Sequence, residues 1–192
     1  METLKDLPIA HFRSAGEFAK WLDKNYAEPA GLWLKMAKKN TAASSISYGE
    51  ALDVALCYGW IDGQVQKYDE QYYLTKFTPR RAKSIWSKRN TEKAEALIAA
   101  GKMKPAGLVA IEQAKADGRW DVAYYSSSQF KMQPDFKKAL DASPKAKSFY
   151  AELNTANKYA IYFQIQTAAS KSRQAKIAKL IKMLEAGRKI HP

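Results

Sequence analysis

The residues best suited to chemistry lie in one stretch, from Gly59 to Asn90. Asp62 follows an expected helix end, and Arg80 and Arg81 come about one hairpin's length later. A carboxylate and a guanidinium pair through two parallel hydrogen bonds, and a second guanidinium would then be left to bind a phosphate or a carboxylate. We therefore predict an anion-binding site in which Asp62 orients an arginine. Its expected members are Trp60, Asp62, Thr78, Arg80, Arg81, Ser84, Trp86 and Ser87.

The same residues also suit a structural role. Adjacent arginines point to opposite faces of a strand, so Arg80 and Arg81 cannot both serve Asp62, and one pair would simply lock a hairpin onto a helix. Trp60 and Trp86 would stack on a ligand or a base if they were exposed, but side chains of this size more often pack in the core. We favour packing for the two tryptophans, and both roles stay open for the arginines.

Catalytic and metal-binding patterns are weak. The two histidines, His11 and His191, lie near opposite ends, and the one cysteine, Cys57, sits in an apolar helical pattern with no histidine nearby. Zinc sites need clustered cysteine, histidine or acidic ligands, and the chain has neither a Gly-rich phosphate loop nor a nucleophile elbow. We expect no cofactor, no metal and no catalytic residue. A non-enzymatic role is favoured, and an enzyme that acts on an anionic small molecule with Asp62 as base is the alternative.

Positive charge is concentrated in the C-terminal third. The whole chain has 32 Lys+Arg and 19 Asp+Glu, a formal net charge of +13. Residues 131–192 contain 13 Lys+Arg and 4 Asp+Glu, a net of +9, which leaves +4 for residues 1–130. Such a surface either keeps a protein soluble or meets an anionic small molecule, an acidic protein, an anionic membrane face or nucleic acid. We favour solvation, with a non-specific nucleic-acid-binding module as the alternative.

Composition indicates a folded protein in a reducing compartment. Apolar residues make up 46% of the 192 residues, which is enough for a core. No apolar run approaches the roughly 18 residues that span a bilayer, and the charged N-terminus has no signal-peptide pattern. Together with the single cysteine, these features predict a cytoplasmic location.

Capping and periodicity patterns predict an α+β fold. Capping boxes at Ser14–Glu17 and Ser47–Glu50 begin two helices, of which the second ends at Gly59. Residues 32–36 and two extended stretches between 60 and 78 predict a small antiparallel sheet with flanking helices. Further on, Asn90 is expected to cap a helix over 91–100, and Pro105 to begin a helix that ends near residue 117.

The C-terminal part is predicted to be helical. Helices are expected over residues 134–142, from 144, over 155–169 and over 172–186, and the last has an apolar face of Ile177, Leu180, Ile181 and Leu184. Irregular structure over 119–133, with a linker at 126–129, separates the two parts. The expected domains are an α+β domain over residues 1–125 and a basic helical module over residues 134–192.

Three sequence blocks stand out: Ala-Leu-Cys-Tyr-Gly-Trp-Ile-Asp-Gly at 55–63, Phe-Thr-Pro-Arg-Arg with the following residues to Asn90, and Gly101–Met103 with Ala114–Trp120. In order and spacing they resemble the YdeI/OmpD-associated family, also called bacteriocin-protection proteins. The last helices resemble the module that ends such proteins, with an alanine-lysine pair followed by threonine-arginine. Here residues 168–173 read Ala-Ala-Ser-Lys-Ser-Arg, which lacks that lysine and has serine for threonine. The resemblance implies stress or antimicrobial-peptide (bacteriocin) resistance and names no reaction.

Overall fold

The computed structural model describes residues 2–192, which form two compact units. Unit 1 comprises residues 2–84 and 90–118, and unit 2 comprises residues 85–89 and 119–192. The chain therefore passes from one unit to the other at three places. The domain limits 1–125 and 134–192 stay a prediction. Within residues 2–192 no helix combines the length and the apolar character needed to cross a membrane.

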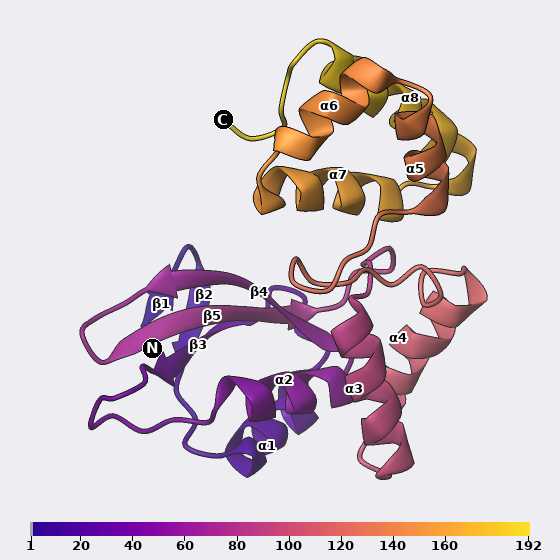
Figure 1. Ribbon diagram of the computed structural model, residues 1–192. Helices are drawn as coiled ribbons and strands as arrows, with labels where there is room; N and C mark the ends of the chain where they lie inside the picture. Colours follow the sequence, from indigo (N-terminus) through magenta and orange to yellow (C-terminus); the bar gives the residue numbers. More distant parts are fainter. Residues whose placement is uncertain (1) are drawn as a thin grey trace. The chain divides into compact units, whose positions relative to one another are not determined.

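Unit 1 is built on a five-stranded sheet of order β1-β2-β3-β5-β4 (Figure 1). The strands are β1 (Thr3–Leu4), β2 (Leu7–Ala10), β3 (Leu32–Ala37), β4 (Trp60–Lys67) and β5 (Tyr72–Pro79). The antiparallel hairpin of β4 and β5 and the antiparallel pairing of β3 with β5 confirm the α+β prediction. The structure adds β2, which runs parallel to β3, so the whole sheet is mixed. Pro8 lacks the N–H group of a strand ladder, which is why β2 gives a weak sequence signal.

Two helices pack against the sheet through an aromatic core. They are α1 (Ala15–Asn25) and α2 (Tyr48–Cys57), and both lie on one side of the sheet in Figure 1. The Phe18 ring of α1 lies 5.8 Å from the Phe77 ring of β5, and the Trp21 ring lies 5.9 Å from the Trp60 ring of β4. Since Phe18, Trp60 and Phe77 have no exposed surface, these rings supply much of the apolar burial that holds α1 on the sheet.

Side-chain hydrogen bonds mark the starts of α1 and α2, whereas α3 begins differently. Ser47 and Glu50 form the predicted capping box of α2. Ser14 caps α1 through the Glu17 N–H, but the Glu17 carboxylate accepts from the Arg13 N–H at 2.7 Å, one residue before the expected position. The helix α3 (Lys88–Ala99) begins before Asn90, so the expected cap at Asn90 was wrong. Its start follows tertiary pairing instead, because the Lys88 N–H donates to the Tyr124 carbonyl oxygen at 2.8 Å.

The helix α4 (Pro105–Ala116) packs against the end of α2 at unusually close range. A Cβ at Gly107 would lie 2.3 Å from the carbonyl oxygen of Cys57, and a Cβ at Gly59 would lie 2.9 Å from that of Ala106. Gly59 also has a φ of +73°, which a residue with a side chain adopts only with strain. Glycine at both positions therefore allows the backbones of α2 and α4 to meet.

Unit 2 is mainly a bundle of four helices, as the sequence predicted. These are α5 (Pro134–Asp141), α6 (Pro144–Glu152), α7 (Thr155–Gln166) and α8 (Ser170–Glu185). The helix α8 buries Ile177, Leu180 and Leu184, which confirms its predicted apolar face. The buried core of the bundle consists of Phe136, Leu140, Ala146, Tyr150, Leu153, Ile161, Ile165, Ile177, Leu180 and Leu184.

Candidate functional site

Asp62, the centre of the predicted anion site, ties the sheet to a helix. It lies on β4 opposite Phe77, and its Oδ2 accepts a hydrogen bond from the Tyr48 hydroxyl at 2.8 Å. Tyr48 is the first residue of α2. The hydrogen-bond partner of Asp62 is therefore a phenol, where the sequence predicted an arginine.

The predicted site residues fall into two groups. In unit 1, Thr78 pairs with Ile61 across the hairpin, and the Arg80 N–H donates to the Gly59 carbonyl oxygen at 2.8 Å, beside Trp60. Exposed Arg81 and half-buried Ser84 follow in the next loop, where the Ser84 N–H donates to the Arg81 carbonyl oxygen. Trp86 and Ser87 belong to unit 2. The eight residues as one site stay a prediction.

Both tryptophans are buried, as the packing role predicts. Trp60 has no exposed surface, and its Nε1 donates to the Tyr26 carbonyl oxygen at 2.7 Å. Trp86 is 2% exposed, and its ring lies 4.9 Å from the Trp120 ring. Burial of this kind leaves neither ring face open to a base or a ligand.

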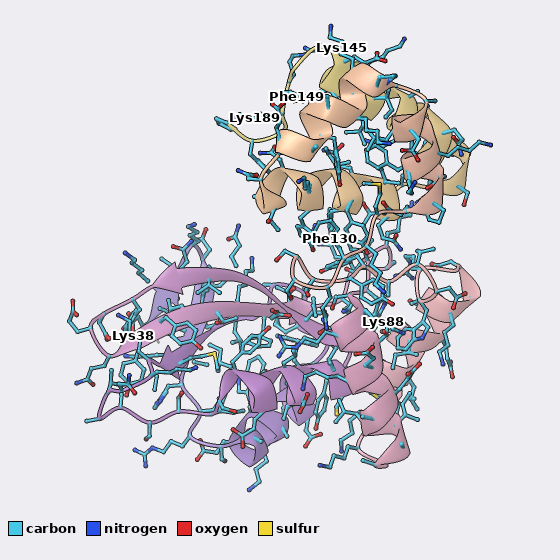
Figure 2. The ribbon with its side chains drawn as sticks, viewed as in Figure 1. Lys38, Lys88, Phe130, Lys145, Phe149 and Lys189 are labelled. Carbon is cyan, nitrogen blue, oxygen red and sulfur yellow. The ribbon has the colours of Figure 1, made fainter. Side chains whose placement is uncertain are left out.

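Unit 2 contains a strongly basic hollow, which we call the basic groove. It has a volume of about 850 Å³ and is formed by α7, α8 and the residues that follow α8. Its five cationic residues are Lys176, Lys179, Lys182, Arg188 and Lys189. The remaining lining residues are Gln164, Ala175, Ala178, Leu180 and Met183. Figure 2 labels Lys189 on the C-terminal segment and Lys145 at the start of α6. Among residues 2–192, no acidic side chain lines the groove.

Three of the four acidic groups in residues 131–192 are engaged elsewhere, and the fourth, Glu152, is exposed and does not line the groove. The Asp141 carboxylate lies 2.7 Å from the Nζ atoms of both Lys137 and Lys147, and these contacts lower its pKa to about 2. Glu185 accepts a hydrogen bond from the Ser143 hydroxyl at 2.7 Å. Within residues 2–192 no ion pair involves any of the five groove cations, so their charge is available to an anion.

A buried asparagine holds the C-terminal segment that completes the groove. Asn157 of α7 is 1% exposed, and its Oδ1 accepts from the N–H groups of Ile190 and His191 at 2.9 Å each. Its Nδ2 donates to the carbonyl oxygen of His191 and to Oδ1 of Asn154. Arg188 and Lys189 directly precede this anchor, so the two cations are carried on a fixed backbone.

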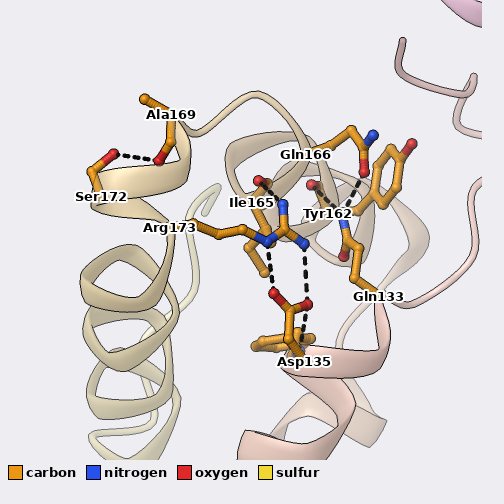
Figure 3. A network of polar contacts seen from close by, with 9 residues as sticks. Gln133, Asp135, Tyr162, Ile165, Gln166, Ala169, Ser172 and Arg173 are labelled. Carbon is orange, nitrogen blue, oxygen red and sulfur yellow. Dashed lines mark hydrogen bonds and ion pairs between the residues drawn. The ribbon is translucent and has the colours of Figure 1, made fainter. Parts of the chain in front are cut away.

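Arg173 anchors the other end of α8 (Figure 3). Its Nε and Nη2 donate to the two carboxylate oxygens of Asp135 on α5 at 2.6 and 3.0 Å, and its Nη1 donates to the Ile165 carbonyl oxygen at 2.6 Å. The hydrogen bond from Arg173 is the main reason that the pKa of Asp135 is lowered. Beside them, Gln133 Nε2 donates to the Tyr162 carbonyl oxygen. The arginine of the resembling motif therefore joins three helices.

Metal binding finds no support among the described side chains. Across residues 2–192, no three His, Cys, Asp or Glu side chains gather closely enough to hold a metal ion. What the structure offers instead is cationic side chains around hollows, which is the chemistry of anion binding.

Two family models match the chain, one in each part. Residues 10–110 match the family model described as a domain of unknown function (DUF8412), and residues 129–187 match the model described as "Bacteriocin-protection, YdeI or OmpD-Associated". The chain belongs to the DUF8412 family, and its residues 129–187 are similar to the YdeI/OmpD-associated family. No curated protein and no solved structure matches it significantly. The predicted resemblance is thereby confirmed.

The basic groove lies largely within the YdeI/OmpD-associated match. Lys176, Lys179 and Lys182 fall inside residues 129–187, and Arg188 and Lys189 follow directly. The sequence signal for the basic groove was a lysine at every third position of α8, although this pattern also suits a solvated helix face. The contribution of the C-terminal segment could not be predicted, because it depends on the contact of Asn157 with residues that are distant in sequence.

Proposed function

We propose that this YdeI/OmpD-associated protein is a cytoplasmic, non-enzymatic binding protein of stress or bacteriocin resistance, and that it holds an anionic partner in the basic groove. The observation that carries the proposal is the set of five groove cations without a carboxylate counter-charge. Because the Asn157 contacts fix the segment that carries two of them, little ordering of that backbone is needed on binding.

Charge also bears on how such a protein would protect a cell. Membrane-active antimicrobial peptides are typically rich in lysine and arginine, and residues 131–192 carry a net charge of +9. Like charges repel, so direct capture of a cationic peptide by the groove is disfavoured. We infer that protection works through an anionic component of the cell.

An acidic protein segment suits the groove better than nucleic acid does. None of the groove-lining residues is aromatic, so the groove offers no platform on which bases would stack. Leu180 and Met183 offer aliphatic contacts between the cations instead. An acidic segment with aliphatic side chains would use both features. Non-specific binding of nucleic acid through its phosphates is the second candidate.

Fluorescence anisotropy with labelled probes tests the proposal. The probes are a glutamate-leucine peptide and a mixed-sequence single-stranded DNA, titrated between about 50 and 200 mM salt. The groove variant Lys179→Glu/Lys182→Glu should weaken peptide binding by about tenfold or more, as expected when two attractive charges become repulsive. The matched control, Lys138→Glu/Lys145→Glu, changes the net charge equally at exposed positions outside the groove.

The control decides between a site and a diffuse charge effect. Near wild-type binding by the control variant, with loss in the groove variant, supports the proposal. Equal loss in both variants would show that net charge alone attracts the probe, and tighter binding of DNA than of peptide would favour the second candidate.

The predicted anion site around Arg80 and Arg81 is proposed as a second site in unit 1. A phosphate- or carboxylate-bearing ligand should raise the melting temperature of the Lys179→Glu/Lys182→Glu protein, in which the basic groove is impaired. Addition of Arg81→Ala should remove that rise, because the exposed guanidinium would be the main contact with the ligand. Equal rises with and without Arg81 would exclude this site.

A further inference from the structure

Unit 1 contains a cavity of about 500 Å³ between α1, α2 and the segment from Leu97 to Lys104. This volume lies in the range of sites for small organic molecules. The apolar lining consists of Ala15, Gly16, Ala19, Val54 and Leu97, with Cys57 and Tyr58 at the end of α2. The charged lining consists of Lys20, Asp23, Glu50, Asp53, Lys102 and Lys104.

Each carboxylate of the cavity already has a partner within the protein. The contacts are Asp23 with the Tyr58 hydroxyl at 2.6 Å, Asp53 with the Lys93 ammonium at 2.6 Å, and Glu50 with the Ser47 hydroxyl at 2.6 Å. Only the contact with Lys93 neutralises a negative charge; the two hydroxyl groups satisfy Asp23 and Glu50 as hydrogen-bond acceptors. A ligand cation would have to compete with these contacts.

The three cavity lysines have no such carboxylate partners. In the described part of the chain, no ion pair involves Lys20, Lys102 or Lys104. The Nζ of Lys104 lies 5.8 Å from the centre of the Tyr58 ring, which is a weak contact for an ammonium group. The lysines are therefore the charges of this cavity that are ready to bind.

The backbone that carries two of these lysines is fixed. The Lys102 N–H donates to the Leu97 carbonyl oxygen at 3.0 Å, and the Lys104 N–H donates to the Cys57 carbonyl oxygen at 3.1 Å. The close approach of Gly107 to Cys57 holds the start of α4 against α2 beside them. This arrangement places Lys102 and Lys104 at the cavity without further ordering of the chain.

We propose that this cavity binds a small organic anion, whose apolar body contacts Ala19, Val54 and Leu97 and whose carboxylate or phosphate meets Lys102 and Lys104. The site is separate from the basic groove and does not depend on the function proposed for it. The Cys57 side chain completes the apolar wall: the residue is 6% exposed and its thiol has no hydrogen-bond partner among residues 2–192.

Cys57 supplies a direct measure of occupancy. It is the only cysteine of the chain, and burial raises the pKa of its thiol, with a further contribution from the charge of Asp53. A thiol of this kind reacts slowly and serves here as a reporter, with no catalytic step assigned to it. A bound ligand covers the wall that contains Cys57 and should slow its alkylation.

The experiment follows alkylation of Cys57 by N-ethylmaleimide with mass spectrometry, in the presence of three probes that share one apolar body. They are 2-naphthoate, naphthalene-2-methanol and 2-naphthylmethylammonium. The carboxylate should protect Cys57 at a concentration about tenfold lower than the neutral alcohol, since an ionic hydrogen bond is stronger than a neutral one. The ammonium probe should protect least.

Four variants locate the effect. Lys102→Glu/Lys104→Glu should remove the preference for the carboxylate, whereas the matched control Lys67→Glu/Lys83→Glu, at exposed positions outside the cavity lining, should retain it. Val54→Trp should fill the cavity and abolish protection by every probe. In the basic-groove variant Lys179→Glu/Lys182→Glu, the probes should protect Cys57 as they do in wild type. This result would separate the present proposal from that for the basic groove.

Several results would overturn the proposal. They are equal protection by all three probes, strongest protection by the ammonium, an unchanged preference in Lys102→Glu/Lys104→Glu, or the absence of protection at millimolar probe. A probe that acted only by stabilising the whole fold from another site would still protect Cys57 in Val54→Trp, and this too would contradict the assignment to the cavity.

Discussion

Arg173 and Asp135 meet through two hydrogen bonds, from Nε to Oδ2 at 2.6 Å and from Nη2 to Oδ1 at 3.0 Å. The two residues lie 38 positions apart, and their contact joins the first turn of α8 to the first turn of α5. A third bond to the Ile165 carbonyl oxygen adds the end of α7. One side chain therefore connects three of the four helices of the bundle, and its geometry suggests the first prediction.

Arg173→Lys should destabilise unit 2 although it preserves the charge. A single ammonium cannot reproduce the two parallel bonds and the carbonyl contact, so we expect a loss of about 1–2 kcal/mol, discounted for the partial exposure of the pair. Urea unfolding and hydrogen exchange of α8 amides measure the effect. The control is Arg188→Lys on the exposed segment after α8, which should change stability little; equal losses would contradict the role given to Arg173.

The same pair makes the stability of unit 2 sensitive to acid. The pKa of Asp135 is lowered by Arg173, and that of Asp141 is lowered to about 2 by Lys137 and Lys147. An unfolded aspartate has a pKa near 3.9, so the unfolded state takes up protons first and the stabilisation is lost as pH falls from about 4 towards 2. Melting temperatures over this range should fall more steeply in wild type than in Asp135→Asn/Asp141→Asn. Parallel curves would contradict the prediction.

Gly107→Ala should loosen α4 from α2. The new methyl group would lie 2.3 Å from the Cys57 carbonyl oxygen and 2.8 Å from that of Leu56, and neither backbone atom can move alone. We expect a cost of about 1–3 kcal/mol, as for other overpacked sites. In Gly49→Ala the methyl group meets nothing within 4 Å, so this variant should be neutral or slightly stabilising. Thermal unfolding compares the melting temperatures of the two variants. Equal melting temperatures would contradict the close contact assigned to Gly107.

Asn157→Leu should weaken binding in the basic groove without a change of charge. The substitution removes the acceptor for the N–H groups of Ile190 and His191, so Arg188 and Lys189 lose their fixed backbone. We expect affinity for the acidic peptide to fall several-fold, because the ordering cost moves to the binding step. Anisotropy measures the affinity, and hydrogen exchange at residues 188–191 reports the release. Unchanged affinity with a released segment would show that the two tail cations do not contribute.

Elements with a complete local signal were predictable from the sequence. The helix α2 has both its capping box at Ser47 and its glycine end at Gly59, and α8 has a continuous apolar face. Elements whose limits depend on contacts with distant residues were not predictable from the sequence. The helix α3 begins at Lys88 because of a bond to Tyr124, and β2 depends on its pairing with β3. The sequence marks Asn90 as a good cap, but it holds no local sign that the chain is already helical there.

The candidate site was predictable only in its chemistry. Excess positive charge near the C-terminus was compatible with an anionic partner, although solvation was the favoured interpretation. Which cations line the basic groove depends on how Asn157 holds the C-terminal segment. Asp62 and Trp60 were identified as special residues, and the structure gives each a hydrogen bond within the fold, to Tyr48 and to Tyr26 respectively. Their residue types could not show these partners, because both contacts join residues that are distant in sequence.

The short segment from Ile85 to Arg89 belongs to unit 2 although unit 1 flanks it on both sides. In unit 2, the Trp86 ring lies against Trp120 and Ser87 pairs with Tyr124. Neither residues 119–192 alone nor residues 129–187 contain this segment. Cutting the chain at residue 118 therefore does not separate the two units cleanly. A gene fusion, truncation or recombination at this point would leave Trp120 without the Trp86 ring. An expression fragment of the C-terminal unit would need the segment 85–89 to be grafted or co-expressed.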